Sequence, residues 1–370
     1  MVSFEIESTN ERRTILHSLG IVGDVAEEVL LYNKNPFQPS AFPLPLPDEP
    51  FVPFWEGIAT AKSGIYAALR EALSQFAFPV RAGISATREY QAAMRQGDAS
   101  AHRSEAERLS LNAPAALTVT LYPTLAGRIP VLFTPDREDF VTLVRALSMR
   151  HEPKPVPSSM GACLITGMIN WGRVREQFAA LGGETPTLTW AAFKKQLSSS
   201  PERYQDRLML LSGGDYSAIP AEAMGLTAEQ WRTLSQTIRR AHEGTHYVTL
   251  RAFGAMRNNL LDEVIADYQG IVAAAGRYRA DWWLRFMGLE QYPAYRAGGR
   301  FENYWGTPPL SEGAIEALKV LVWRAGITLE AFHDVYAERP PAERLIALIG
   351  STLETLAAND GAARLARYMG

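Results

Sequence analysis

The longest helical pattern in the sequence covers residues 228–254, and it constrains the fold because polar side chains lie along its buried face. Thr227 is placed to cap the start of this helix, and Gly254 ends it. The buried face is predicted from residues that recur three or four positions apart: Trp231, Leu234, Ile238, His242, Thr245 and Thr249. Histidines at or beside such a face are protected from solvent, either as metal ligands or as hydrogen-bonded core residues.

The same helix contains His-Glu-Gly-Thr-His at positions 242–246, which matches the pattern H-E-x-x-H. Residues four apart on a helix lie one turn apart on the same face, so His242 and His246 can reach one metal ion. Glu243 projects about 100° around the helix axis from His242. From there its carboxylate can act on a metal-bound water without being a ligand, and zinc lowers the pKa of such a water towards about 7.

A second helix, predicted over about 260–275, offers the third ligand that is usual in catalytic zinc sites. Asn259 can cap this helix, with Asp262 at its third position. Glu263 then falls in the first turn, and Asp267 lies one turn later on the same face. A glutamate ligand, followed by an aspartate that accepts a hydrogen bond from a ligand imidazole, provides both the ligand and its orientation.

These two helices resemble the gluzincin branch of zinc metallopeptidases, the thermolysin-like and aminopeptidase-like enzymes, in which H-E-x-x-H is followed by E-x-x-x-D on a second helix. The resemblance rests on HEGTH and DEVIAD alone. It implies one zinc ion (Zn2+) per chain, held by His242, His246 and Glu263, with Glu243 as general base and Asp267 as the partner of His242. The implied activity is that of a peptidase. Sixteen residues separate His246 from Glu263, slightly fewer than in the best-known members.

Three other interpretations of these residues stay open. One is a catalytically inactive protein that binds a metal and acts as a regulatory or interaction partner. Another is a metallohydrolase that cleaves a non-peptide amide or an ester. The last has no metal: a buried cluster of two histidines, a glutamate and an aspartate would then need every polar group paired, to avoid a desolvation cost of several kcal/mol.

Hydrolysis of this kind needs a donor for the negative charge on the carbonyl oxygen, usually a tyrosine or histidine outside the motif. An aromatic and glycine-rich segment, residues 292–309, follows the two helices and is predicted to be a loop that lines the cleft. The candidate donors or substrate contacts are Tyr292, Tyr295, Arg300, Tyr304 and His333. The competing interpretation is that these aromatic residues pack the loop down and that His333 forms a structural pair with Asp334.

The remaining patterns predict an α+β fold that is predominantly helical. Residues 117–135 indicate a β-hairpin, and residues 160–169 and 207–211 indicate two further strands. The proline-rich segment 151–157 follows about 150 residues, the size of one domain, and is the favoured boundary. We therefore expect residues 1–150 to form a mostly helical domain that includes the hairpin. Residues 151–370 are expected to form a zincin-like metallohydrolase domain, with a small sheet beside the H-E-x-x-H helix.

Helices are also predicted over residues 10–34, 55–76 and 86–96, and after Asp136, which is placed to cap the helix that follows it. Seven prolines fall within residues 36–54, which excludes a helix or a central strand there. The large apolar residues between these prolines favour an extended arm that lies on the protein surface.

Composition excludes several classes of protein. With 37 basic and 40 acidic residues, a net charge of −3 and no run of lysine or arginine, we expect no nucleic-acid partner. Cys163 is the single cysteine, which excludes an intrachain disulfide and a cysteine-based zinc site. No window approaches the ~18 consecutive apolar residues of a membrane span, and the N-terminal residues lack the apolar region of a signal peptide. We expect a cytoplasmic protein with a peptide or small amide substrate; the sequence leaves the oligomeric state open.

Overall fold

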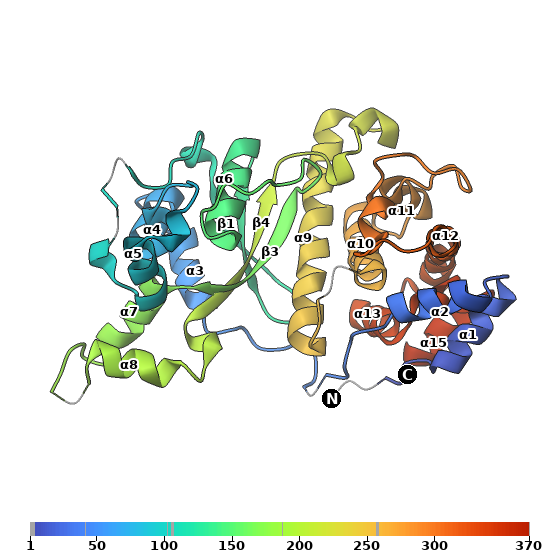
Figure 1. The fold of residues 1–370 in the computed structure, drawn as a ribbon, viewed down its shortest axis with the longest axis horizontal. Helices are drawn as coiled ribbons and strands as arrows, with labels where there is room; N and C mark the ends of the chain where they lie inside the picture. The colour runs from blue at the N-terminus through green and yellow to red at the C-terminus, as the bar shows by residue number, and fades with distance from the viewer. Residues whose placement is uncertain are drawn as a thin grey trace. The chain divides into compact units, whose positions relative to one another are not determined.

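The computed structural model describes residues 4–40, 42–101, 103–104, 107–186, 188–256 and 259–369. This part of the chain is mostly helical and includes a small four-stranded sheet (Figure 1). The predicted class, a predominantly helical α+β fold, is confirmed. The chain forms two compact units: one contains residues 47–214, and the other combines residues 1–46 with residues 215–370.

The sheet has the strand order β1-β2-β4-β3. Strands β1 (Thr118–Tyr122) and β2 (Ile129–Thr134) form the predicted antiparallel hairpin. Strand β2 pairs in parallel with β4 (Gln205–Ser212), and β3 (Ala162–Ile169) lies antiparallel to β4 at the other edge. Strands β2 and β4 are buried along almost their whole length, as is typical of central strands covered on both faces.

This pairing corrects the predicted domain boundary near residue 150. Strand β2 precedes that residue and β4 follows it, so the hydrogen bonds between them join both sides of the boundary into one unit. The sheet belongs to the unit of residues 47–214, whereas the H-E-x-x-H residues belong to the other unit. The sequence predicts the small sheet within a C-terminal domain of residues 151–370. The structure instead builds the sheet from strands on both sides of residue 150.

The largest hydrophobic cluster described in the sheet-containing unit lies on one face of the sheet. Alternate strand residues such as Val119, Leu132 and Leu210 point into it, and side chains of helices α3 and α6 fill it. The helices of this unit are α3 (Val52–Ala59), α4 (Ile65–Ala72), α5 (Arg88–Gln91), α6 (Arg137–Ser148), α7 (Trp171–Ala180) and α8 (Trp190–Leu197). As predicted, Asp136 caps α6, and its side chain accepts a hydrogen bond from the Asp139 backbone N–H.

Two predicted helices differ from the structure. The helix predicted over residues 55–76 is split into α3 and α4, because a turn intervenes and Gly64 adopts a φ of 88°, in the left-handed region that favours glycine. The helix predicted over residues 86–96 consists of the single turn α5 followed by a π-helical turn, η3 (Ala92–Gln96). Hydrophobic spacing alone does not reveal either interruption.

His151 is fully buried in the sheet-containing unit and joins three of its segments. Its Nε2 donates to the carbonyl of Gln75 at 2.7 Å, and its Nδ1 lies 3.2 Å from the hydroxyl of Tyr90, which donates to it. The backbone N–H of His151 donates to the carbonyl of Arg145 in α6. Burial lowers the pKa of His151 to about 4, against the opposing effects of Gln75 and Glu152. The imidazole is therefore neutral in the folded protein near neutral pH.

We expect His151 to make the protein less stable as the pH falls from about 6.5 to about 4. The folded pKa lies below the unfolded one, so the unfolded chain binds the proton first and is favoured throughout this range. Between pH 7 and pH 5 the loss from this residue is about 2 kcal/mol. The measurement is urea unfolding at both pH values for the wild type and for His151→Asn, since asparagine tolerates the φ of 61° found here. An equal pH dependence in both proteins would contradict the assignment.

The second unit is built from helices in its described residues. Two of them come from the N-terminal segment, α1 (Thr9–Ser18) and α2 (Gly23–Tyr32). The others are α9 (Ala228–Phe253), α10 (Leu260–Ala275), α11 (Ala280–Met287), α12 (Glu312–Tyr336), α13 (Pro341–Gly350), α14 (Leu353–Ala357) and α15 (Gly361–Ala366). Short 3₁₀ turns connect them, including η8 (Tyr216–Ala218) and η10 (Arg300–Tyr304).

A buried ion pair links the N-terminal helix α1 to the C-terminal part of this unit. Arg12 of α1 contacts Glu354 of α14 at 3.0 Å, and both side chains are almost completely buried. The guanidinium of Arg12 also donates to the carbonyls of Leu30 and Asn33. A buried charge needs such partners, so removal of either end of this pair would be costly. Ser8 caps α1 through a capping box with Glu11.

Candidate metal centre

Helix α9 carries the H-E-x-x-H residues and forms where the sequence predicts it. Thr227 and Gln230 form a capping box at its start, and Gly254 ends it with a φ of 73°. The chemically important side chains of this helix are buried: His242, Glu243 and His246. Their polar atoms must therefore find partners within the protein.

Helix α10 runs antiparallel to α9 and supplies those partners. Asn259 caps it by accepting a hydrogen bond from the Asp262 backbone N–H, as predicted. The direction follows from the order of contacts along the two helices: Ile238 with Gly270, His242 with Asp267, and His246 with Asp262. Glu263 and Asp267 thus face α9 because they lie one turn apart on the same side of α10.

Three potential ligand atoms converge between the two helices. The Nε2 atoms of His242 and His246 lie 3.1 Å apart. A carboxylate oxygen of Glu263 lies 3.5 Å from the first nitrogen, and the other oxygen lies 3.6 Å from the second. In a tetrahedral site with metal–ligand bonds of about 2.0–2.1 Å, neighbouring ligands are about 3.3–3.4 Å apart. The donor set His-His-Glu and its spacing therefore fit a zinc ion.

Asp267 fixes the orientation of His242. The Nδ1 of His242 donates to Asp267 at 2.9 Å, which leaves the lone pair of Nε2 pointing at His246 and Glu263. The hydroxyl of Tyr216 also donates to the same Asp267 oxygen, at 2.5 Å. Asp267 is fully buried. This is the arrangement in which a carboxylate holds a metal-binding imidazole in one tautomer.

Asp262 lies beside His246 in the way that Asp267 lies beside His242. Its carboxylate lies 3.4 Å from the Nδ1 of His246, without the geometry of a hydrogen bond. The hydroxyl of Thr249 lies 3.4 Å from the same carboxylate oxygen. Each imidazole thus has a buried carboxylate behind it and its Nε2 directed to the same point.

Arg300 balances part of the negative charge in this cluster. It contacts Glu263 at 2.8 Å and Asp267 at 3.1 Å, and it donates to the hydroxyls of Tyr216 and Ser217. Burial disfavours a proton on His246, but the carboxylates of Asp262 and Glu263 outweigh burial and raise the pKa of this imidazole well above its usual value. A divalent cation bound at the three ligand atoms would take the place of that proton and supply its positive charge.

The two glutamates of the site have different electrostatic environments. Burial raises the pKa of Glu243, and the neighbouring His242 and His246 only partly oppose this. Burial would also raise the pKa of Glu263, but contact with His246 and the charges of His242 and Arg300 outweigh it and hold the pKa below its usual range. Glu263 is therefore ionised, as a metal ligand must be. Glu243 accepts a proton more readily, as a general base must.

The structure places the five sequence-level candidates for oxyanion or substrate contacts in different surroundings. Arg300 adjoins the cluster, and Tyr304 is buried close enough that the charges of Glu263 and Arg300 act on its pKa, which burial raises. Tyr292 stacks on Trp323, and the hydroxyl of Tyr295 donates to the carbonyl of Gly299. The Nδ1 of His333 lies 2.8 Å from the hydroxyl of Tyr268, with which it forms a hydrogen bond. These last three residues have structural partners and are not part of the cluster.

Sequence reasoning missed Tyr216, which precedes α9 in the short turn η8. Its backbone N–H donates to the hydroxyl of Ser235 on α9, which seats the ring beside His242. Ser217 and Ala218 have φ values of 53° and 55°, which are rare for residues other than glycine. No pattern in the sequence signals this turn, because its geometry depends on contacts with α9.

The close packing of α9 and α10 depends on Gly270, and we expect Gly270→Ala to destabilise the protein by about 1–3 kcal/mol. A Cβ atom there would lie 2.9 Å from Cγ2 and 3.0 Å from the carbonyl oxygen of Ile238, and the oxygen cannot move without the helix. Gly57→Ala in α3 is the control, since that Cβ would have open space and alanine favours a helix. Thermal unfolding of both variants checks this; equal stability of Gly270→Ala and wild type would contradict it.

The fold and the site define a mostly helical protein with a buried His-His-Glu cluster that has the donor set of a metal centre. The chain belongs to DUF7005, a family of unknown function, which matches residues 14–360. No curated protein and no solved structure matches the chain. Among the described helices, none has both the length and the apolar character needed to cross a membrane.

Proposed function

We propose that this protein is a zinc-dependent hydrolase and that its substrate class is a peptide or another amide. One observation carries the proposal. Two imidazole nitrogens, His242 Nε2 and His246 Nε2, face each other at 3.1 Å beside the carboxylate of Glu263. Hydrogen bonding at Nδ1 leaves the His242 Nε2 with a lone pair, so either a cation or a proton on the His246 Nε2 must lie between the two nitrogens.

In this proposal His242, His246 and Glu263 hold the metal. A zinc ion there would lower the pKa of a bound water and polarise the substrate carbonyl. Glu243 would take the proton from the attacking water and later give it to the leaving amine. Asp267 keeps His242 in the tautomer required for binding, and Tyr216 holds Asp267 in place.

Arg300 and Tyr304 are the candidates for stabilising the negative charge on the carbonyl oxygen. Burial and the nearby Glu263 raise the pKa of Tyr304 well above its usual value, so its phenol stays protonated and can donate. Arg300 is always charged, but Glu263 and Asp267 already engage it. Tyr304 is therefore the better candidate of the two.

The runner-up is a metal-binding protein without catalysis, which acts as a regulatory or interaction partner. The observation in its favour is the pairing of Arg300 with Glu263, which already satisfies part of the carboxylate that would serve as ligand. A hydrolase of a non-peptide amide or an ester is a further alternative, because the site chemistry is the same for those substrates.

Metal analysis and a substrate screen test the proposal together. Elemental mass spectrometry of protein purified without a metal-affinity step should find about one zinc per chain, and His246→Ala should lose it. The screen then compares unstructured peptides with small amides and esters. Absence of metal in the wild type, even after zinc is added back, would overturn the proposal. Zinc without turnover of any substrate would favour the runner-up.

A further inference from the structure

A pocket of about 310 Å³ lies within the sheet-containing unit, apart from the residues of the metal centre. Its wall comes from four regions: η1 (Ser74–Ala77), the segment from residue 85 to η3, the C-terminal end of α6, and β3. Exposed residues at the rim, including Arg95 and Arg150, leave it open to solvent. Its volume is at the lower end of the range of small-molecule sites, which begins near 300 Å³.

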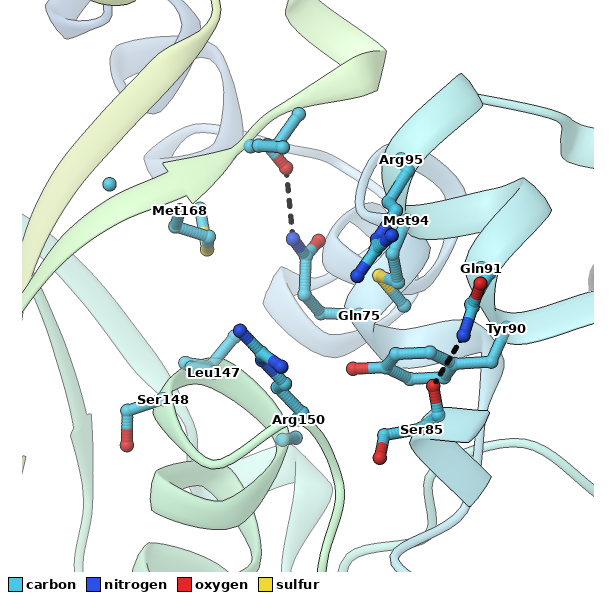
Figure 2. A pocket seen from close by; sticks show the side chains of 13 residues that line it. Gln75, Ser85, Tyr90, Gln91, Met94, Arg95, Leu147, Ser148, Arg150 and Met168 are labelled. Carbon is cyan, nitrogen blue, oxygen red and sulfur yellow. Dashed lines mark hydrogen bonds between the residues drawn. The ribbon is translucent and has the colours of Figure 1, made fainter. Parts of the chain in front are cut away.

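The charged side chains of this pocket are both cationic. Figure 2 shows the guanidinium groups of Arg95 and Arg150 directed into the same space, one from η3 and the other from the residues after α6. The pocket wall contains no aspartate or glutamate. Within the described residues, neither guanidinium has a hydrogen bond or an ion pair with the protein. Two unpaired guanidiniums that face one cavity indicate an anionic ligand, because arginine binds carboxylate and phosphate groups through paired N–H donors.

A buried acceptor lies in the same wall. Gln75 is 6% exposed, and its Nε2 donates to the carbonyl of Ile169 at 2.9 Å. Its Oε1 has no hydrogen-bond partner among the described residues. An unpaired buried carbonyl costs about 1–3 kcal/mol unless something donates to it. A ligand with an N–H group would satisfy this oxygen.

The remaining wall favours a carboxylate over a phosphate. Met94, Leu147 and Met168 provide apolar surface for the body of a ligand. The last turn of α6, including Ser148, also lines the pocket, and the C-terminal end of a helix carries partial negative charge. That partial negative charge opposes a doubly charged phosphate more strongly than a singly charged carboxylate.

The pocket residues are held in place by unusual backbone geometry. Arg150 and His151 adopt φ values of 55° and 61°, in a region that costs energy for residues other than glycine. The buried imidazole of His151 links Gln75 and Tyr90, which both line the pocket. The turn that carries Arg95 is π-helical, a form that is frequent at functional sites. The arginines, the glutamine and the tyrosine are therefore preorganised.

We propose that this pocket binds a small molecule that joins a carboxylate to an N–H donor and an apolar body, the chemistry of an N-acylated amino acid. Arg95 and Arg150 bind the carboxylate, and the carboxamide oxygen of Gln75 accepts from the N–H group. Met94, Leu147 and Met168 cover the apolar part. This site is separate from the metal centre in its residues and does not depend on the proposed hydrolase activity.

Isothermal titration calorimetry of the full chain with N-acetyl-L-leucine tests this proposal, in a buffer without phosphate. We expect a dissociation constant of ~1 mM or lower. Arg95→Gln and Arg150→Asn should each weaken binding at least tenfold, while Arg88→Gln, an exposed arginine on α5 outside the pocket, should not. N-acetyl-L-leucinamide, which lacks the charge, should fail to bind. Binding should persist in His246→Ala, which separates this pocket from the metal centre.

Several outcomes would overturn the proposal. One is no binding of N-acetyl-L-leucine to wild-type protein whose melting curve shows that it is folded. Another is binding that both arginine variants retain. Binding of inorganic phosphate in place of the acetylated amino acid, with loss in the arginine variants, would replace the carboxylate assignment by a phosphate one. Loss of binding in His246→Ala alone would assign the ligand to the metal centre.

Discussion

Replacing Glu243 with glutamine is expected to lower the rate of hydrolysis by about 10²–10⁴-fold while the zinc content stays at about one ion per chain. Glutamine keeps the size and hydrogen-bonding capacity of the side chain but cannot take a proton from water. Glu243 has no hydrogen bond or ion pair within the described residues, so the substitution removes no contact that holds the fold. The measurement combines turnover of a substrate found in the screen with elemental analysis of the same sample.

The matched control is Glu229→Gln, which makes the same change on the exposed first turn of α9. It should leave both activity and zinc content unchanged. If Glu243→Gln retains full activity, another group is the base and the assignment of Glu243 is wrong. If it loses zinc together with activity, Glu243 is a ligand or a structural support of the ligands.

The main elements of the candidate site were predictable because they depend on local spacing. The four-residue spacing of His242 and His246 places both on one helix face, and the same spacing relates Glu263 to Asp267. Capping residues at Thr227 and Asn259 then define where each helix starts. The structure buries the polar faces of these two helices against each other.

The residues that the sequence did not reveal depend on contacts between distant segments. Tyr216 reaches Asp267 through a strained turn, and Arg300 reaches Glu263 from a loop after α11. The predicted domain boundary failed for the same reason. Arg12 and Glu354 are 342 residues apart, and no periodic pattern relates them. Long-range ion pairs and strand pairing are decided by the tertiary fold, and propensity has little influence on them.

The sequence also did not reveal the pocket of the sheet-containing unit. Arg95 and Arg150 are separated by 54 residues in the sequence, and each looks like an ordinary surface arginine. Their common direction arises from a π-helical turn and from the left-handed backbone at Arg150. Both features run against local preference, and such features concentrate where a protein binds something.

Zinc itself is expected to stabilise the folded protein. An ion that binds the folded chain alone, at a free concentration a hundred times its dissociation constant, adds about 2.7 kcal/mol. For a unit of about 200 residues this corresponds to a rise of roughly 5–10 °C in Tm. The physical reason is the group of carboxylates around His242 and His246, whose negative charge a divalent cation offsets. The measurement is the melting curve of chelator-treated protein before and after zinc is restored.

Two histidine variants decide whether the zinc-dependent rise in Tm comes from the proposed metal site. His246→Ala removes a ligand and should abolish the zinc-dependent rise in Tm. His333→Gln alters another buried histidine of the same unit, one that pairs with Tyr268 instead of the cluster. It should lower Tm in both states and leave the zinc-dependent rise intact, because His333 lies outside the ligand set. If His246→Ala responds to zinc as the wild type does, the ion binds elsewhere, and the convergence of His242, His246 and Glu263 is a hydrogen-bonded core cluster without a metal.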